Sequence, residues 1–196
     1  MKALDLLTQA TQQNTDFLFE MPAEESARRN DVGGATTYRY TLSVRLGYPT
    51  SYFPKAPFIR AEHFDTAIPF FGIFEEHPEI YNLTAEEWEL SRSIRRYIAN
   101  FAKNGDPNDG DPVSVKWPEY TASSRQFINL DTPTTVETFD RERQYLFVTE
   151  VLPAIVKVGK EVDEALALAL KGKKRGTKGS KKGRSPRSLI GEHRFI

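Results

Sequence analysis

A segment in the middle of the chain carries the sequence pattern of a helix at its start, along its length and at its end. Thr84 and Glu87 match a capping box, in which the two side chains satisfy backbone N–H groups of the first turn. Gly105 can end the helix in the left-handed conformation. Residues that recur at three- and four-residue spacing between these points predict one buried stripe: Trp88, Ser91, Ile94, Ile98 and Phe101.

Further strand and helix patterns surround this segment. Residues 38–44 alternate between apolar and polar side chains, which is the period of a strand, and 127–130 is a shorter strand candidate. Residues 16–30 and 137–170 have helical patterns, and we expect Pro153 to bend or split the second. Four residues define the predicted apolar side of the first: Phe17, Leu18, Ala23 and Ala27.

The net charge of zero conceals two regions of opposite sign. From Lys171 onward the chain has ten basic residues and one acidic residue, whereas the remainder has 17 basic and 26 acidic residues. The segment from Lys171 to Arg187 has no apolar side chain, and we expect it to be disordered. Such a run is compatible with contact to a polyanion, such as nucleic acid, a heparin-like chain or anionic lipid, and also with a solvated terminus.

Composition excludes several classes of site. The chain has no cysteine, which excludes disulfides, thiolate catalysis and cysteine-ligated metals. No two histidines have metal-ligand spacing, and the run of Asp106, Asp109 and Asp111 is accompanied by prolines that spoil a calcium-loop pattern. We therefore expect neither a metal nor another cofactor. No apolar stretch approaches the roughly 18 residues of a transmembrane segment, and residues 1–19 lack the apolar core of a secretory signal.

One loop of the sequence resembles the histidine loop of the type-B carboxylesterase and cholinesterase family. Residues 61–72 are Ala-Glu-His-Phe-Asp-Thr-Ala-Ile-Pro-Phe-Phe-Gly, in which His63, Asp65, Phe71 and Gly72 have the family's spacing. Further matches follow in the family's order: Leu-Thr-x-x-Glu at 83–87, Asn-Phe-Ala-Lys-Asn-Gly-Asp-Pro-Asn at 100–108, Trp-Pro-Glu-Tyr-Thr at 117–121, and Phe147 with Leu152-Pro153, where Val148 replaces the usual tryptophan. Within the family, the turn at 105–111 is most similar to that of bile-salt-activated lipase, or cholesterol esterase.

The resemblance implies an α/β-hydrolase fold, a mixed sheet with helices on both faces, of which this chain supplies the last strands and helices. It also implies a division of the chain. We expect an irregular lead-in at 1–15, the C-terminal portion of the carboxylesterase domain at 16–158, a helical extension at 159–170 and the basic, disordered tail at 171–196.

The resemblance further implies a reaction. In this family an ester is cleaved by a serine nucleophile, with histidine as general base and an acidic residue orienting the histidine. His63 is then the general base of the triad. The sequence contains no Gly-x-Ser-x-Gly elbow in a strand–turn–helix context, no oxyanion-hole glycines ahead of one and no triad acid. We therefore predict a terminal segment of a carboxylic ester hydrolase of the lipid-hydrolysing type, inactive by itself, whose substrate binds only the complete protein.

Two alternative functions and one further partner remain open. The chain could be a non-catalytic, cholinesterase-like interaction or adhesion protein, a class that often replaces the catalytic histidine. It could instead bind polyanions through the run from Lys171 to Arg187. The helical region 147–170 could form a homodimer, as the equivalent region does in cholinesterases. Family members are mostly secreted, whereas this sequence shows no signal peptide, so its location stays open.

Overall fold

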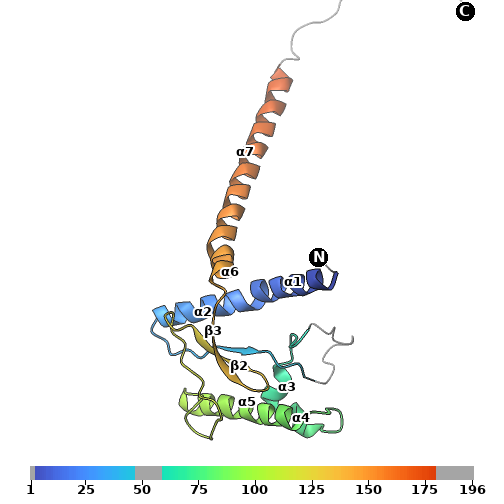
Figure 1. Cartoon of the computed structure of the whole chain (residues 1–196). Coiled ribbons are helices and arrows are strands. Elements are labelled where there is room, and N and C mark those ends of the chain that lie inside the picture. The colour runs from blue at the N-terminus through green and yellow to red at the C-terminus, as the bar shows by residue number, and fades with distance from the viewer. Residues whose placement is uncertain (1–2, 47–58, 180–196) are drawn as a thin grey trace, which may run out of the picture. The chain divides into compact units, whose positions relative to one another are not determined.

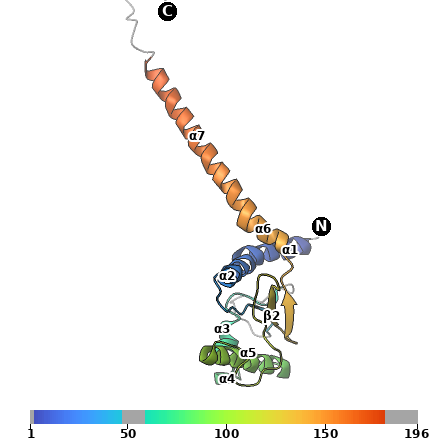
Figure 2. The ribbon, with the colours of Figure 1, turned by 90° about the vertical axis from the view of Figure 1, so that its left-hand side faces the viewer.

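The computed structural model describes residues 3–46 and 59–179, with side chains described as far as Lys171. The chain divides into two compact units between Tyr145 and Leu146, and each is described by itself. The first unit contains a small sheet between two layers of helix (Figure 1, Figure 2). This arrangement is a mixed α/β structure, as the sequence predicts, and it is compatible with a portion of an α/β-hydrolase fold.

The sheet has three strands in the order β1-β2-β3, comprising β1 (Tyr40–Leu42), β2 (Gln126–Leu130) and β3 (Thr135–Thr138). β1 runs parallel to β2, and β3 runs antiparallel to it. Hydrogen bonding continues beyond β1, since Ile128 N–H donates to the Arg39 carbonyl and Ser43 N–H to that of Leu130. The predicted strands at 38–44 and 127–130 therefore exist, the first shortened to its centre.

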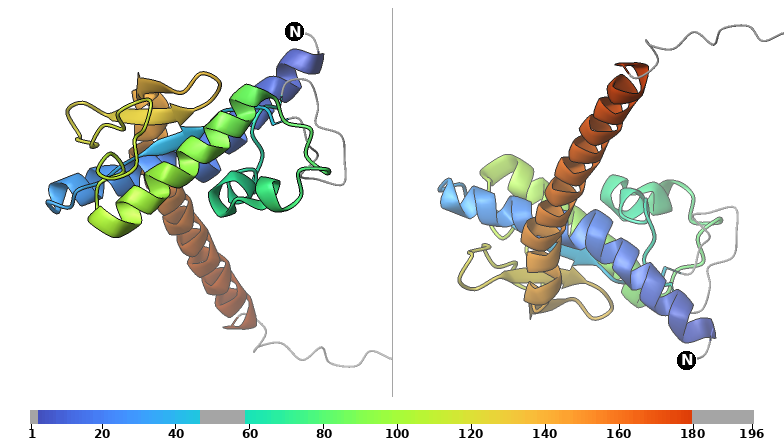
Figure 3. Two further views of the ribbon diagram at one scale, coloured as in Figure 1. Left: turned by 90° about the horizontal axis from the view of Figure 1, so that it is seen from below. Right: turned by 90° about the horizontal axis from the view of Figure 1, so that it is seen from above.

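Helix α5 (Ala85–Asn104) covers one face of this sheet. Its buried residues Leu90, Ile94 and Tyr97 form the core with Ile128 and Leu130 of β2. The helices near the N-terminus cover the opposite face, as the two views from below and above show (Figure 3). The central strand β2 is thus mostly buried between helical layers, as in an α/β domain, whereas the residues of β3 are exposed.

The caps of α5 are those that the sequence predicts. The Thr84 hydroxyl accepts from Glu87 N–H at 3.2 Å, and the Glu87 carboxylate accepts from Thr84 N–H at 2.7 Å. Gly105 ends the helix with φ of 74°. The buried stripe is rotated from the predicted one. Ser91 and Ile94 are buried as expected, whereas Phe101 is 49% exposed.

The N-terminal segment is helical, not irregular. α1 (Ala3–Thr15) continues through a π-helical turn, η1 (Asp16–Glu20), into α2 (Met21–Val32). The prediction of an irregular lead-in at 1–15 is therefore wrong. No side chain of α1 is fully buried. Alanine, leucine and glutamine fill much of this segment and favour helix intrinsically, and the following helix supplies its continuation.

The face that α2 turns to the sheet also differs from the predicted one. Met21, Glu24 and Ala27 are buried, whereas Phe17 and Leu18 are 50% and 59% exposed, and Ala23 is exposed too. Of the four predicted apolar contacts only Ala27 is correct. The carboxylate of Glu24 is buried in the middle of this face because the guanidinium of Arg39 lies beside it. The helical period of the sequence does not reveal such a pairing.

Both π-helical turns stand immediately before a proline-containing helix start. η1 precedes Pro22, and η2 (Phe147–Val151) precedes Pro153. Proline lacks an N–H and clashes with the carbonyl four residues earlier. A π turn widens the helix at that point, and Met21 N–H and Leu152 N–H bond five residues back. Pro153 is therefore accommodated at the start of α7, directly after the π-helical turn η2.

The segment after β3 forms helices, later than the sequence predicts. Residues 137 and 138 belong to β3, and α6 (Glu142–Leu146) begins afterwards. In the second unit, η2 is followed by α7 (Leu152–Gly179). α7 continues beyond Leu170 into the segment expected to be disordered, and lysine and arginine are compatible with helix. The remainder of the basic tail, 180–196, lies outside the described residues. Among the described helices, none is long and apolar enough to cross a membrane.

Candidate functional site

His63 lies at the tip of a tight turn that leads into α3 (Ala67–Phe71). The turn is closed by Asp65, whose fully buried carboxylate accepts from Glu62 N–H at 2.8 Å. Asp65 N–H in turn donates to the Glu62 carbonyl at 3.1 Å. Phe64, between His63 and Asp65, has a φ of 75°, which is rare for a residue with a side chain. The turn thus buries Asp65 and leaves His63 exposed.

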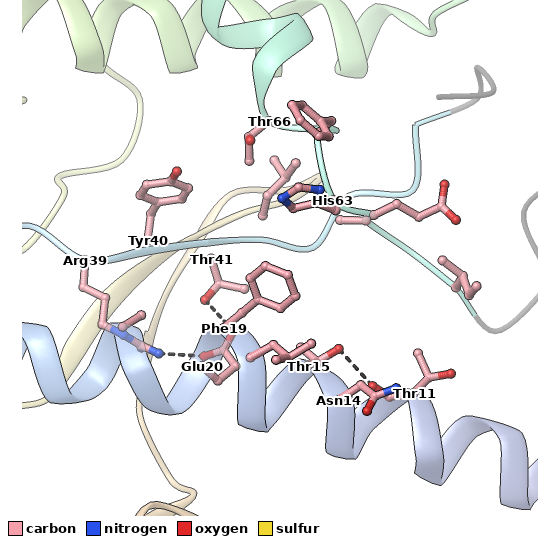
Figure 4. Close-up of a pocket in the computed structure, with 17 residues that line it drawn as sticks. Thr11, Asn14, Thr15, Phe19, Glu20, Arg39, Tyr40, Thr41, His63 and Thr66 are labelled. Carbon is pink, nitrogen blue, oxygen red and sulfur yellow. Dashed lines mark hydrogen bonds and ion pairs between the residues drawn. The ribbon is translucent and has the colours of Figure 1, made fainter. Parts of the chain in front are cut away.

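A hollow of about 860 Å³ lies beside His63 (Figure 4). Its residues come from α1, η1 and α2 on one wall, from β1 and from the histidine turn on the other. Side chains of β1 alternate between the two faces of the sheet. Arg39, Tyr40, Thr41 and Leu42 all line the hollow, so it follows the edge of β1 that β2 does not occupy.

The imidazole of His63 is exposed and has aromatic neighbours. Its ring centroid lies 5.8 Å from that of Phe19 in η1 and 4.4 Å from that of Phe64. Within residues 3–46 and 59–179, no group makes a hydrogen bond to this imidazole. Its nitrogens are thus held near the hollow by ring contacts while remaining accessible to a reactant.

Two acidic residues, Glu20 and Glu62, line the same hollow, and Glu20 bonds groups other than His63. Its carboxylate accepts from Arg39 at 2.6 Å and from the Thr41 hydroxyl at 3.3 Å. The 17 described residues that line the hollow include threonines but no serine. The described part of the chain therefore brings a histidine to this hollow without a serine nucleophile or an acid bound to the histidine.

The sequence does not predict the charged cluster beneath the hollow. Arg39 is 5% exposed and lies between Glu20 and the fully buried Glu24, whose carboxylate also accepts from Tyr120 at 2.6 Å. Burial, followed by the Glu24 hydrogen bond, raises the pKa of Tyr120. The guanidinium of Arg39 also lies 4.6 Å from the ring centroid of Phe127. In the sequence, the one indication of this cluster is Arg39, which lies on the predicted polar side of the strand at 38–44.

The other candidate residues have structural or exposed positions. His77 is exposed after α4 (Ile73–Glu76) and lies 3.5 Å from the Glu79 carboxylate. Asp106 accepts from Asn108 N–H at 2.8 Å, a bond that lowers the pKa of Asp106. Within the described residues no group of three acidic or histidine side chains could hold a metal ion. Most of the run from Lys171 to Arg187 has no described side chains.

Comparison with known protein families shows the family to which the chain belongs. The model of the "Carboxylesterase family" matches residues 3–148, which is most of the sequence and includes the histidine turn. The chain belongs to the carboxylesterase family. The resemblance found in the sequence is therefore confirmed at the level of the family, and the matched region begins within α1, ahead of the predicted boundary at residue 16.

Several curated proteins are similar to this carboxylesterase-family chain. Carboxylesterase 5A of Mus musculus is 31% identical over 155 residues, covering 74% of this chain and 25% of that protein. Acylcarnitine hydrolase of Rattus norvegicus is 35% identical over 142 residues, covering 70% and 23%. Acetylcholinesterase of Bungarus fasciatus is 39% identical over 85 residues, covering 43% and 14%. The chain thus spans about a quarter or less of the length of these relatives.

Proposed function

We propose that this chain is the histidine-bearing terminal segment of a carboxylic ester hydrolase of the serine-histidine-acid class, and that His63 is its general base. The observation that carries the proposal is the position of His63. Its imidazole is exposed beside a hollow of about 860 Å³, on a turn that the buried Asp65 closes, and has no hydrogen-bonding partner in the described chain. A general base must be accessible to the proton that it removes.

The chemistry assigns a role to each part of this turn. His63 takes the proton of a serine hydroxyl as that oxygen attacks the ester carbonyl, and returns it to the leaving alcohol. Asp65 fixes the turn through Glu62 N–H and is a positioning residue, because its buried carboxylate bonds the backbone. Phe19 and Phe64 restrict the rotation of the imidazole by ring contact.

The surfaces around the hollow support a role within a larger sheet. The outer edge of β1 has no partner strand among the described residues. In the hollow beside it, Leu18, Phe19 and Phe64 are 59%, 50% and 68% exposed. Unpaired strand edges and exposed apolar side chains are normally covered. We infer that the portion of the hydrolase that supplies the serine and the acid covers them.

The first test uses the chain by itself. A fluorophosphonate probe labels an activated serine, and the proposal predicts no labelling of this chain and no hydrolysis of an ester substrate. Rapid labelling at a serine of this chain would contradict it, because a nucleophile would then be present within the sequence. An active serine hydrolase labelled in the same buffer serves as the control.

The second test places His63 in the context of a complete relative. Residues 3–148 replace the matching segment of rat acylcarnitine hydrolase, and hydrolysis of acylcarnitine is measured. In a chimera that is active, His63→Ala is expected to lower kcat by about 10³-fold or more, since a triad base is lost. His77→Ala is the matched control, because His77 is also exposed and lies outside the hollow. Equal rates for the two variants would refute the assignment.

The same chimera distinguishes this proposal from the main alternative. A non-catalytic, cholinesterase-like interaction protein makes no use of a general base, so its segment need not support ester cleavage in any host. A folded chimera, verified by circular dichroism and gel filtration, that lacks activity with His63 intact would favour that alternative.

A further inference from the structure

The π-helical turn η1 brings a phenylalanine and a carboxylate to the hollow beside His63. Phe19 and Glu20 both line the hollow, and the ring centroid of Phe19 lies 5.8 Å from that of His63 (Figure 4). Phe19 is 50% exposed, so burial fixes its ring only in part. The position of that ring therefore depends on the backbone of η1. Single π-helical turns within α-helices are frequent at functional sites.

Glu20 attaches the end of η1 to the sheet. Its carboxylate accepts from Arg39 Nη2 at 2.6 Å and from the Thr41 hydroxyl at 3.3 Å (Figure 4). Thr41 belongs to β1, and Arg39 directly precedes that strand. The guanidinium of Arg39 is itself held, since it lies 4.6 Å from the ring centroid of Phe127 and its Nε lies 3.7 Å from Glu24. A charge-assisted bond to so buried an arginine fixes the end of η1 firmly.

A second ion pair holds the beginning of η1. Asp16 is the first residue of this turn, and its carboxylate accepts from Arg141, which directly precedes α6. The side chain of Asp16 is 13% exposed, and Gln12 in α1 also donates to it, at 2.8 Å. Both ends of η1 are thus bonded to other parts of the fold, and Phe19 lies between them.

We propose that Glu20 and Arg39 are positioning residues for His63, which act through η1 and the ring of Phe19. The proposal rests on the role of His63 as general base. Because no described group makes a hydrogen bond to this imidazole, its orientation depends on its ring contacts with Phe19 and Phe64. Weakening the bond between Glu20 and Arg39 loosens η1, and the imidazole then samples more orientations. A misplacement of about 1 Å in an active site can cost about 100-fold in rate.

The competing interpretation is that the pair of Glu20 and Arg39 only stabilises the fold. A variant would then lower the free energy of unfolding but leave the imidazole of the folded molecules where it is. The two interpretations therefore differ in what happens to His63 in folded protein, which a spectroscopic signal of that residue measures.

Two matched pairs of variants make this comparison. Glu20→Gln removes a charge with little change in shape, and Glu25→Gln removes the same charge from α2, where Glu25 pairs with Arg29. Phe19→Leu and Phe17→Leu form the second pair, because both phenylalanines belong to η1 and are 50% exposed. Among the described residues that line the hollow are Phe19 and Glu20, but neither Phe17 nor Glu25.

The first measurement is the NMR signal of the His63 Cε1–H group in the full chain, assigned with His63→Ala. This signal is sensitive to the ring current of Phe19. Phe19→Leu and Glu20→Gln should shift it in the same direction, whereas Phe17→Leu and Glu25→Gln should leave it in place. Circular dichroism establishes that each variant is folded.

If Glu20→Gln does not fold, Thr41→Val removes one bond to the same carboxylate and should give a smaller shift in the same direction. An unchanged signal in folded Glu20→Gln, or in Thr41→Val where that variant replaces it, would overturn the proposal. An unchanged signal in Phe19→Leu would overturn it as well.

The second measurement is activity in an active chimera of residues 3–148 with rat acylcarnitine hydrolase. Glu20→Gln should lower kcat by about tenfold and leave KM within about twofold, and Glu25→Gln should leave both within about twofold. A Glu20→Gln chimera with the kcat of its parent would overturn the proposal. If His63→Ala retains the full rate, the role of His63 as general base fails instead, while the NMR comparison still decides whether Glu20 orients the imidazole.

Discussion

The buried carboxylate of Glu24 joins the N-terminal helix to the sheet, and Glu24→Gln tests how strongly. Glu24 is fully buried and accepts from the Tyr120 hydroxyl at 2.6 Å and from Arg28 Nε at 2.8 Å. Its other oxygen lies 3.7 Å from Arg39 Nε. Glutamine has nearly the same shape, so the substitution removes the charge while leaving little change in packing.

The expected loss of stability comes from the hydrogen bonds that no longer involve a charged carboxylate. A hydrogen bond to a charged group is stronger than a neutral one by about 1 kcal/mol, and two such bonds are affected. Arg39 also loses a nearby negative charge in a buried place but keeps Glu20 at 2.6 Å, which limits that loss to about 1 kcal/mol. We expect Glu24→Gln to lower the free energy of unfolding by about 3 kcal/mol.

Urea unfolding followed by circular dichroism measures this change. Glu119→Gln is the matched control, because Glu119 is exposed, and it should change the free energy of unfolding by less than about 0.5 kcal/mol. Tyr120→Phe removes one of the two bonds, and the double variant should show a coupling of about 1 kcal/mol between the sites. A loss below about 1 kcal/mol for Glu24→Gln would refute the reasoning, since the cluster would then behave like an exposed ion pair.

Three further predictions concern the stability of the first unit. Burial raises the pKa of Tyr145 to about 12, so its neutral form stabilises the fold below the unfolded pKa of about 10, and this contribution is lost as pH rises through about 12. Tyr145→Phe should therefore flatten the alkaline decline in a series of urea titrations. Gly110→Ala should cost about 2 kcal/mol or more in thermal unfolding, because φ is 139° and a Cβ would overlap the side chain of Asn100. Thr84→Ala should cost about 1 kcal/mol by urea unfolding, through loss of the α5 cap.

Local sequence patterns were sufficient where each element is determined by neighbours in the chain. The start and end of α5 depend on Thr84, Glu87 and Gly105, all within or beside the helix, and the structure has both caps as predicted. The strand at 127–130 follows likewise from its own composition. The family resemblance rested on short motifs with fixed spacing, and the match to residues 3–148 confirms it.

The sequence was insufficient where burial depends on a distant partner. Arg39 occupies a position that strand alternation assigns to the polar side, and its burial depends on Glu20 and Glu24 in another element. The apolar face predicted for residues 16–30 was mostly wrong for the same reason. α1 was missed because its alanine, leucine and glutamine residues favour helix through intrinsic propensity, and none of its side chains is fully buried. The hollow beside His63 arises only when three separate segments meet.

The role of His63 is tested most directly by chemical rescue. In an active chimera of residues 3–148 with rat acylcarnitine hydrolase, His63→Ala removes the imidazole and leaves a space beside the hollow. Added imidazole, which ionises near neutrality as histidine does, should restore part of the lost kcat in proportion to its neutral fraction. The account predicts a rate that falls with the substitution and rises again with imidazole. A His63→Ala chimera that hydrolyses acylcarnitine as fast as its parent would contradict it.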